Sequence, residues 1–264
     1  MGLFDFPSVV LTPVDEFLSD YFSLGWRITF WSILTAIMST IAFFLTAPLS
    51  RIASLKKMLK KAQRNLNQYD GDFDGLKPLA KKALSLSFKR LFLTLIPTLC
   101  AVLPLLVILL FLSNRFDYVK PTSGQAVDYH VSDSDNNSTS SEWRWFDTSN
   151  TAVMAHTGTL TWPSQPEHWV FQYKDKTVSH LPPVPVSFLH KPQWWNLLIA
   201  NPAGYLDESV EIDHIQFSFT PLQIDYGWFS GTWALLFYPL YTLCSLGLFL
   251  FLNHRRKRLD NDRS

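Results

Sequence analysis

Residues 28–66 read ITFWSILTAIMSTIAFFLTAPLSRIASLKKMLKKAQRNL, and their character changes abruptly at Arg51. The first 23 of these residues carry no charged side chain, whereas the following 16 carry six lysines or arginines and no acidic residue. About 20 largely apolar residues are needed to cross the roughly 30 Å hydrocarbon core of a bilayer. Basic segments beside such runs stay in the cytoplasm. The stretch therefore predicts a transmembrane helix that leads directly into a basic cytoplasmic segment.

Two more apolar runs, residues 91–112 and 229–252, resemble the first, residues 28–49, in length and in their lack of charge. A buried helix of a soluble protein rarely stays uncharged for so long. We therefore expect an α-helical membrane protein with three transmembrane helices, residues 28–49, 91–112 and 229–252.

The charges between the runs are strongly unequal, although the net charge of the chain is only +1. Residues 51–89 contain ten Lys or Arg against three Asp, while residues 113–226 contain six against thirteen Asp or Glu. By the positive-inside rule, the N-terminus lies outside and the C-terminus lies in the cytoplasm. The same rule predicts outside segments at residues 1–27 and 113–228, and cytoplasmic ones at residues 50–90 and 253–264.

Both cysteines, Cys100 and Cys244, fall inside apolar runs, so the predicted outer domain cannot contain a disulfide. This favours a bacterial inner membrane over the membrane of the endoplasmic reticulum. Before the first span, Thr12-Pro13 has the pattern of a helix start, and an apolar stripe follows it at helical spacing. We expect an amphipathic helix there, with Asp15 on its polar face, lying either in the outer membrane interface or against the outer domain.

Residues 50–90 have the pattern of a helical hairpin, which we also expect to form a coiled coil. Acidic and glycine residues at 69–75 interrupt two amphipathic segments. The hairpin could contact anionic lipid, a protein or ribosomal RNA, whereas sequence-specific nucleic-acid binding is not expected because no recognition module accompanies the charge. Its basic residues are Arg51, Lys56, Lys57, Lys60, Lys61 and Arg64.

The outer segment has the pattern of an extracytoplasmic all-β, sandwich-like domain inserted between the second and third spans. Its strand candidates are short and β-prone and are separated by turn signals; they are residues 127–131, 151–160, 168–173, 177–181, 194–199 and 213–219. The tryptophans of this segment are expected in its core or at the membrane interface.

No catalytic, cofactor-binding or metal-binding motif is evident in the sequence, so we expect a protein that is not an enzyme and has no cofactor. Hydroxyl side chains lie along one face of the first span, at Thr29, Ser32, Thr35, Ser39 and Thr46. They could simply bond to their own backbone or pack against another helix. Alternatively, they could line a partly hydrated groove that accepts polar segments of a client protein. Prolines at Pro97, Pro104 and Pro239 predict kinks in the second and third spans.

This architecture resembles the YidC/Oxa-type membrane protein insertases. The similarity is greatest to their minimal three-span relatives, namely the archaeal YidC-like proteins, the insertase-like subunit of the ER membrane complex and the ER transmembrane coiled-coil protein. It rests on Pro48-Leu49-Ser50-Arg51, the basic helix at residues 52–66, Lys77-Pro78-Leu79, Pro97 with Pro104, and Trp228 with the basic residues 254–258. The groove arginine of the family would fall near Phe43, where this chain has no charge, and the minimal relatives lack a large outer domain.

The resemblance implies an insertase-like protein that assists membrane proteins in inserting or folding, with the bilayer, nascent membrane proteins, the ribosome or another membrane subunit as partners. An interaction protein is the alternative. In that case the spans anchor a β-domain that binds a component of the envelope or of a membrane complex.

Overall fold

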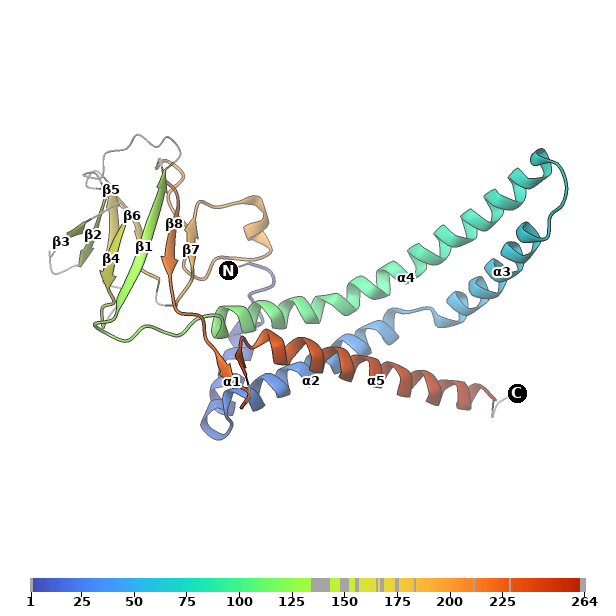
Figure 1. Ribbon diagram of the computed structural model, residues 1–264, viewed down its shortest axis with the longest axis horizontal. Helices are drawn as coiled ribbons and strands as arrows, with labels where there is room; N and C mark the ends of the chain where they lie inside the picture. Colours follow the sequence, from blue (N-terminus) through green and yellow to red (C-terminus); the bar gives the residue numbers. More distant parts are fainter. Residues whose placement is uncertain are drawn as a thin grey trace. The chain divides into compact units, whose positions relative to one another are not determined.

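The computed structural model describes residues 2–133, 143–147, 152–154, 157–164, 166, 169–173, 176–182, 184–210, 212–227 and 229–261. The chain divides into two compact units, which we describe separately (Figure 1). The β unit consists of Met1–Ile28 and Val107–Leu236, and the helical unit of Thr29–Leu106 and Phe237–Ser264.

Three helices of the described chain are long and apolar enough to cross a membrane: α2 (Leu24–Thr46), α4 (Phe73–Phe116) and the Ala234–Arg255 part of α5 (Ala234–Asn261). Their positions agree with the three expected spans. The first begins earlier than residue 28, and it ends before Pro48, which disfavours helical geometry at Ala47. The third begins later than residue 229, because Ser230–Gly231 form the short strand β10.

Two helices lie on either side of the acidic turn in the segment expected to form a hairpin. Helix α3 (Leu49–Asn67) ends shortly before the acidic turn, and α4 begins after it at Phe73. The second arm of the hairpin and the second span are not separate segments, however, because α4 is one helix of 44 residues. It continues through Pro97 and Pro104, as α5 does through Pro239, so kinks at these prolines stay a prediction. Coiled-coil packing between α3 and α4 also stays a prediction.

The expected start of the N-terminal helix was wrong. Helix α1 (Ser8–Tyr21) begins after Pro7 and contains Pro13 in its interior. The expectation for the polar face of this helix was also wrong in part, because Asp15 is completely buried. The apolar stripe faces outward instead, with Phe17 61% and Tyr21 70% exposed. Asp15 is buried because two arginines of the same unit pair with it.

Two four-stranded antiparallel sheets form the described part of the β-domain, as expected for a sandwich (Figure 1). One sheet has the order β4-β1-β8-β7 and the other β3-β2-β5-β6. The strands of the first are β1 (Ala126–Asp133), β4 (Thr157–Thr161), β7 (Phe188–His190) and β8 (Ile212–Ser218). Those of the second are β2 (Trp143–Asp147), β3 (Ala152–Met154), β5 (Trp169–Tyr173) and β6 (Lys176–His180). A separate pair consists of β9 (Ile224–Asp225) and β10.

One strand expectation was wrong: Trp194–Leu197 form the 3₁₀ helix η2 instead of a strand. Asn196 side-chain Oδ1 accepts a hydrogen bond from the Gln193 backbone N–H at 2.6 Å, which stabilises the turn. Strands β2, β7, β9 and β10 were not expected. Trp143–Asp147 lies directly after a polar stretch, and Phe188–His190 is only three residues long. Residues 151–160, expected as one strand, contain parts of two strands, β3 and β4, that belong to different sheets.

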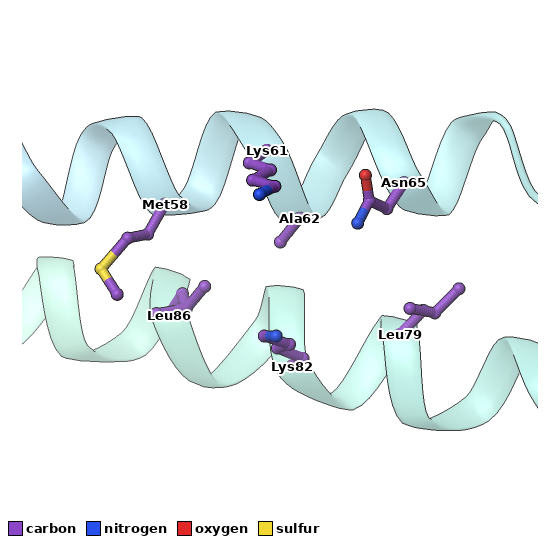
Figure 2. Close-up of a pocket in the computed structure, with 7 residues that line it drawn as sticks. All are labelled: Met58, Lys61, Ala62, Asn65, Leu79, Lys82 and Leu86. Atoms are coloured by element: carbon purple, nitrogen blue, oxygen red, sulfur yellow. The ribbon is translucent and has the colours of Figure 1, made fainter.

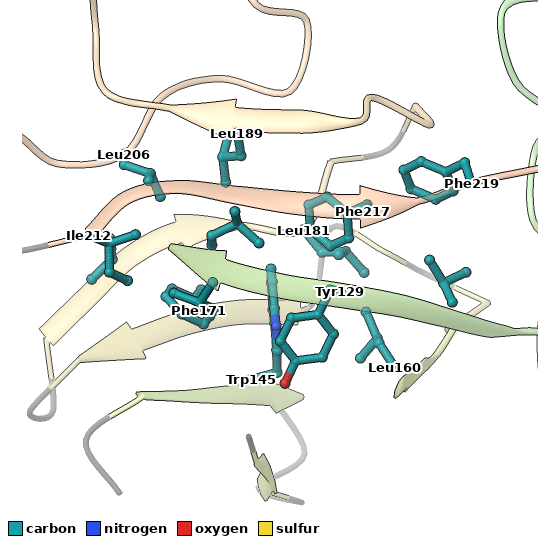
Figure 3. Packing of buried hydrophobic residues seen from close by; sticks show 14 of the residues in the cluster. Tyr129, Trp145, Leu160, Phe171, Leu181, Leu189, Leu206, Ile212, Phe217 and Phe219 are labelled. Atoms are coloured by element: carbon teal, nitrogen blue, oxygen red, sulfur yellow. The ribbon is translucent and has the colours of Figure 1, made fainter. Parts of the chain in front are cut away.

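Aromatic side chains from both sheets meet in the core of the β-domain (Figure 3). The ring of Trp145 in β2 lies 4.9 Å from that of Phe171 in β5 and 6.1 Å from that of Phe217 in β8. Aromatic pairs at such distances add to the hydrophobic effect of burying the rings. The two sheets are therefore held together by a cluster of buried side chains, which includes residues of the long strands β1 and β8.

Strand β8 provides a test of this packing, because Ile215 is completely buried and its neighbour Gln216 is exposed. We expect Ile215→Ala to destabilise the β-domain by about 2–5 kcal/mol, through lost burial and the cavity that remains. Gln216→Ala should change stability by about 0.5 kcal/mol or less. Thermal unfolding of the purified chain, followed by circular dichroism, measures both. Equal losses in the two variants would contradict the assigned faces of β8.

Candidate functional site

Polar side chains lie on one side of α2, within a helix that is otherwise apolar enough to cross a membrane. Ser32 and Thr35 are completely buried, and Ser39 and Thr40 are nearly so. The Thr35 hydroxyl donates a hydrogen bond to the carbonyl oxygen of Trp31 at 2.6 Å, one turn earlier. The Thr35 hydroxyl thus bonds to the backbone of its own helix, as expected if the hydroxyl pattern does not mark a groove.

Ser39 is in a different situation, because it lines a cavity of about 310 Å³ in the helical unit. The cavity is a shallow, largely open hollow lined by residues of α2, α4 and α5, and four of these residues carry hydroxyl groups. They are Ser39 and Thr40 of α2, and Tyr241 and Ser245 of α5; the apolar lining residues are Phe43, Ala101, Leu246 and Phe249. We call this space the hydroxyl cavity.

Two of these hydroxyl groups are buried and have no hydrogen-bond partner in the described part of the chain: Ser39 Oγ and Ser245 Oγ. Leaving a buried polar group unpaired costs about 1–3 kcal/mol. Such groups are rare in proteins and call for an explanation, for example an incoming polar group. The hydroxyl cavity therefore brings unpaired hydroxyl groups together between helices that are apolar enough to cross a membrane.

The structure brings only one of the five hydroxyl residues expected in a groove into this cavity. Thr46 is exposed and donates to the carbonyl oxygen of Ala42 at 2.7 Å. Thr29, Ser32 and Thr35 do not line the cavity. Sequence reasoning missed Thr40, Tyr241 and Ser245. The last two lie four residues apart on α5, a spacing that places them on one helical face.

A second feature of the helical unit is the basic hairpin. Lys57, Lys60, Lys61 and Arg64 of α3 line a hollow of about 440 Å³ together with Asn65 and Gln68, and no acidic side chain takes part. Between the arms, residues of α3 and α4 enclose a second hollow of about 260 Å³ (Figure 2). Its lining includes Lys61 and Lys82, one from each arm. The described hairpin surface is thus suited to anionic partners.

The β unit contains a buried ion cluster that sequence reasoning missed. The Asp15 carboxylate accepts hydrogen bonds from Arg27, whose Nε lies 3.1 Å from Oδ1, and from Arg115 Nε. The Arg27 guanidinium also lies over the ring of Phe116, 5.1 Å from its centre. Arg27 stands near the start of α2 and Arg115 near the end of α4, so one carboxylate joins α1 to the ends of α2 and α4 that lie in this unit.

Further polar contacts surround the start of α5 within the same unit. Trp233 Nε1 donates to Asp117 Oδ1 at 2.7 Å, and Ser113 Oγ donates to the other oxygen of that carboxylate. The Tyr226 hydroxyl donates to the carbonyl oxygen of Thr232 at 2.9 Å, and burial raises the pKa of this phenol. These bonds hold the chain where it enters α5.

Within the described ranges, no group of three His, Cys, Asp or Glu residues could hold a metal ion. Comparison with family models, curated proteins and solved structures finds no match to this chain. The resemblance to the insertases therefore rests on the sequence motifs alone.

The unpaired hydroxyls can be tested through stability. We expect Ser39→Ala and Ser245→Ala each to leave the chain as stable as the wild type or to stabilise it by up to about 1–3 kcal/mol, because each removes a buried group that lacks a partner. Thr35→Ala should instead destabilise it, since that hydroxyl is bonded and fully buried. Thermal unfolding in detergent measures the three variants. A clear loss of stability in both serine variants would contradict the assignment.

Proposed function

We propose that this chain is a non-enzymatic integral membrane protein that assists other membrane proteins in inserting or folding. The observation that carries the proposal is the hydroxyl cavity, with its two unpaired serine hydroxyls inside the helical unit. The basic hairpin and the similarity to YidC/Oxa-type insertases point in the same direction.

The proposed mechanism concerns the cost of carrying polar groups through hydrocarbon. A peptide-like polar group that loses its hydrogen bonds costs about 4–8 kcal/mol on transfer from water to cyclohexane. Ser39, Thr40, Tyr241 and Ser245 offer both donors and acceptors to such a group. A client segment that rests against them keeps part of its hydrogen bonding while it crosses. The barrier to insertion is thereby lowered.

The proposed topology has the β-domain and N-terminus outside and the hairpin and C-terminus in the cytoplasm, in a bacterial inner membrane. The ten basic residues of residues 51–89 and the thirteen acidic residues of residues 113–226 support it. In this orientation the hairpin meets the ribosome, the nascent chain or the anionic inner leaflet. Each lysine near such a leaflet contributes about 1 kcal/mol of attraction.

A second candidate function is favoured by a specific surface of the β unit. Trp194 and Leu197 of η2 are each 80% exposed, and Trp195 beside them is 40% exposed. Neighbouring apolar side chains left open in this way often mark a protein-binding surface. The alternative is therefore an anchored interaction protein whose β-domain binds an envelope or membrane-complex partner through η2.

The topology can be tested with single cysteines in a chain that carries Cys100→Ser and Cys244→Ser. Ser123 and Ser54 are both exposed, one in the β unit and one on α3. We expect a cysteine at Ser123 to react with a membrane-impermeant maleimide in cells whose inner membrane is intact. A cysteine at Ser54 should react only after that membrane is permeabilised. The reverse pattern would overturn the proposed orientation.

The proposed function can be tested by placing a photo-crosslinking amino acid at Ser39 or Ser245. We expect both positions to capture nascent membrane proteins during their synthesis, because both line the hydroxyl cavity. A probe at Phe251, which is 61% exposed on α5 and does not line the cavity, is the matched control. Capture of a mature envelope protein from probes at Trp194 or Leu197 alone would reject the insertase proposal and favour the alternative.

A further inference from the structure

A half-open cavity of about 680 Å³ lies in the β unit. Three cationic side chains line it, Arg27, Arg115 and Lys120, and no acidic side chain does. Asn114, Ser8 and Thr12 add neutral polar groups. We call it the cationic cavity. It is separate from the hydroxyl cavity and shares no residue with it.

The three cations of the cationic cavity outnumber the two carboxylates, Asp15 and Glu16, that pair with its arginines. Asp15 is completely buried behind them and supplies one negative charge to two guanidinium groups. Glu16, which is exposed, also pairs with Arg115, with its Oε1 3.8 Å from Arg115 Nη2. An exposed ion pair at that distance contributes little. With Lys120 added, the cavity keeps an excess of positive charge.

The Asp15 contacts also orient the two arginines. Their side chains are 13% and 30% exposed, so each guanidinium is fixed at one edge and can still face the cavity. A guanidinium presents its N–H donors in a planar fork that matches the oxygens of a phosphate group. Because these side chains are already ordered, less side-chain entropy is lost when a ligand binds. The arrangement therefore suits a phosphate-bearing anion.

The remaining lining favours an amphiphile over a free ion. Apolar side chains, among them Leu24, Phe111, Val119 and Leu222, make up much of the cavity wall. Arg27 lies at the start of α2 and Arg115 at the end of α4, where two helices apolar enough to cross a membrane terminate. Arginines at such ends reach toward lipid headgroups. The cavity thus offers cations for a phosphate and an apolar wall for acyl chains, and it lies at helix ends where headgroups are expected.

We propose that the cationic cavity binds the headgroup of an anionic phospholipid, with its phosphate at Arg27, Arg115 and Lys120 and the upper part of its acyl chains along the apolar wall. This assignment does not depend on the insertase proposal. It applies equally to an insertase and to an anchored interaction protein.

The test uses the full chain purified in an uncharged detergent, with native mass spectrometry to measure binding. The probes are dioctanoyl phosphatidylglycerol, dioctanoyl phosphatidylcholine and glycerol 3-phosphate. We expect phosphatidylglycerol to bind more tightly than phosphatidylcholine, and glycerol 3-phosphate, which has no acyl chain, to bind most weakly. Glycerol 3-phosphate binding as tightly as phosphatidylglycerol would overturn the lipid assignment in favour of a free-phosphate site.

Two substitutions at exposed positions report on the cavity without breaking the ion cluster. Lys120→Gln removes one cation and should weaken phosphatidylglycerol binding about fivefold. Asn114→Asp adds a carboxylate beside Arg115 and should also weaken it. Lys191→Gln, in the same unit but outside the cavity lining, is the control and should leave binding unchanged. Unchanged binding in Lys120→Gln and Asn114→Asp, or equal binding of both phospholipids, would overturn the proposal.

Discussion

The buried carboxylate of Asp15 is the interaction on which the organisation of the β unit depends. It pairs with Arg27, 12 residues later, and with Arg115, 100 residues later. A carboxylate that is completely buried requires such partners, and removing one member of a buried ion pair typically costs about 3–5 kcal/mol. The pairing also explains why α1 turns its apolar stripe outward. Asp15 must face the arginines, so Phe17 and Tyr21 face away.

Buried polar groups thus occur in both units, and in each unit some of them have hydrogen-bond partners and others have none among the described residues. In the β unit, the Asp15 and Asp117 carboxylates have short contacts to donors from distant parts of the chain, whereas Asp5 Oδ1 and Trp145 Nε1 have no partner among the described residues. In the helical unit, Ser39 and Ser245 have none among the described residues. A satisfied network holds a structure in place, whereas unpaired hydroxyls in an apolar setting keep their capacity to bond. The two unpaired serines of the helical unit line one cavity together, which is why the proposed function is placed there.

The elements that were predictable from the sequence have strong and local signals. Three long uncharged runs, the interruption between Asn67 and Phe73, and the alternation along β8 each appear in consecutive residues. The errors arose where distant residues decide the outcome. Asp15 looks like a solvent-exposed residue of an amphipathic helix until Arg115 is brought beside it.

The lining of the hydroxyl cavity could likewise not be predicted from local sequence patterns. The hydroxyls of α2 form a visible pattern in the sequence, but the identity of those that line the cavity depends on which helix faces them. Ser245 and Tyr241 of α5 are more than 200 residues from Ser39 in the chain. No local pattern relates them. Likewise, η2 was expected as a strand because its tryptophans favour β structure, whereas the side-chain bond of Asn196 closes a turn.

The most direct measurement of the central claim is to purify the full chain from native membranes in a mild detergent and to identify what accompanies it. We expect ribosomes carrying nascent membrane proteins, and fewer of them when Lys56, Lys57, Lys60 and Lys61 are replaced by glutamine. A stable envelope complex, recovered without nascent chains and unaffected by these four substitutions, would contradict the proposed function.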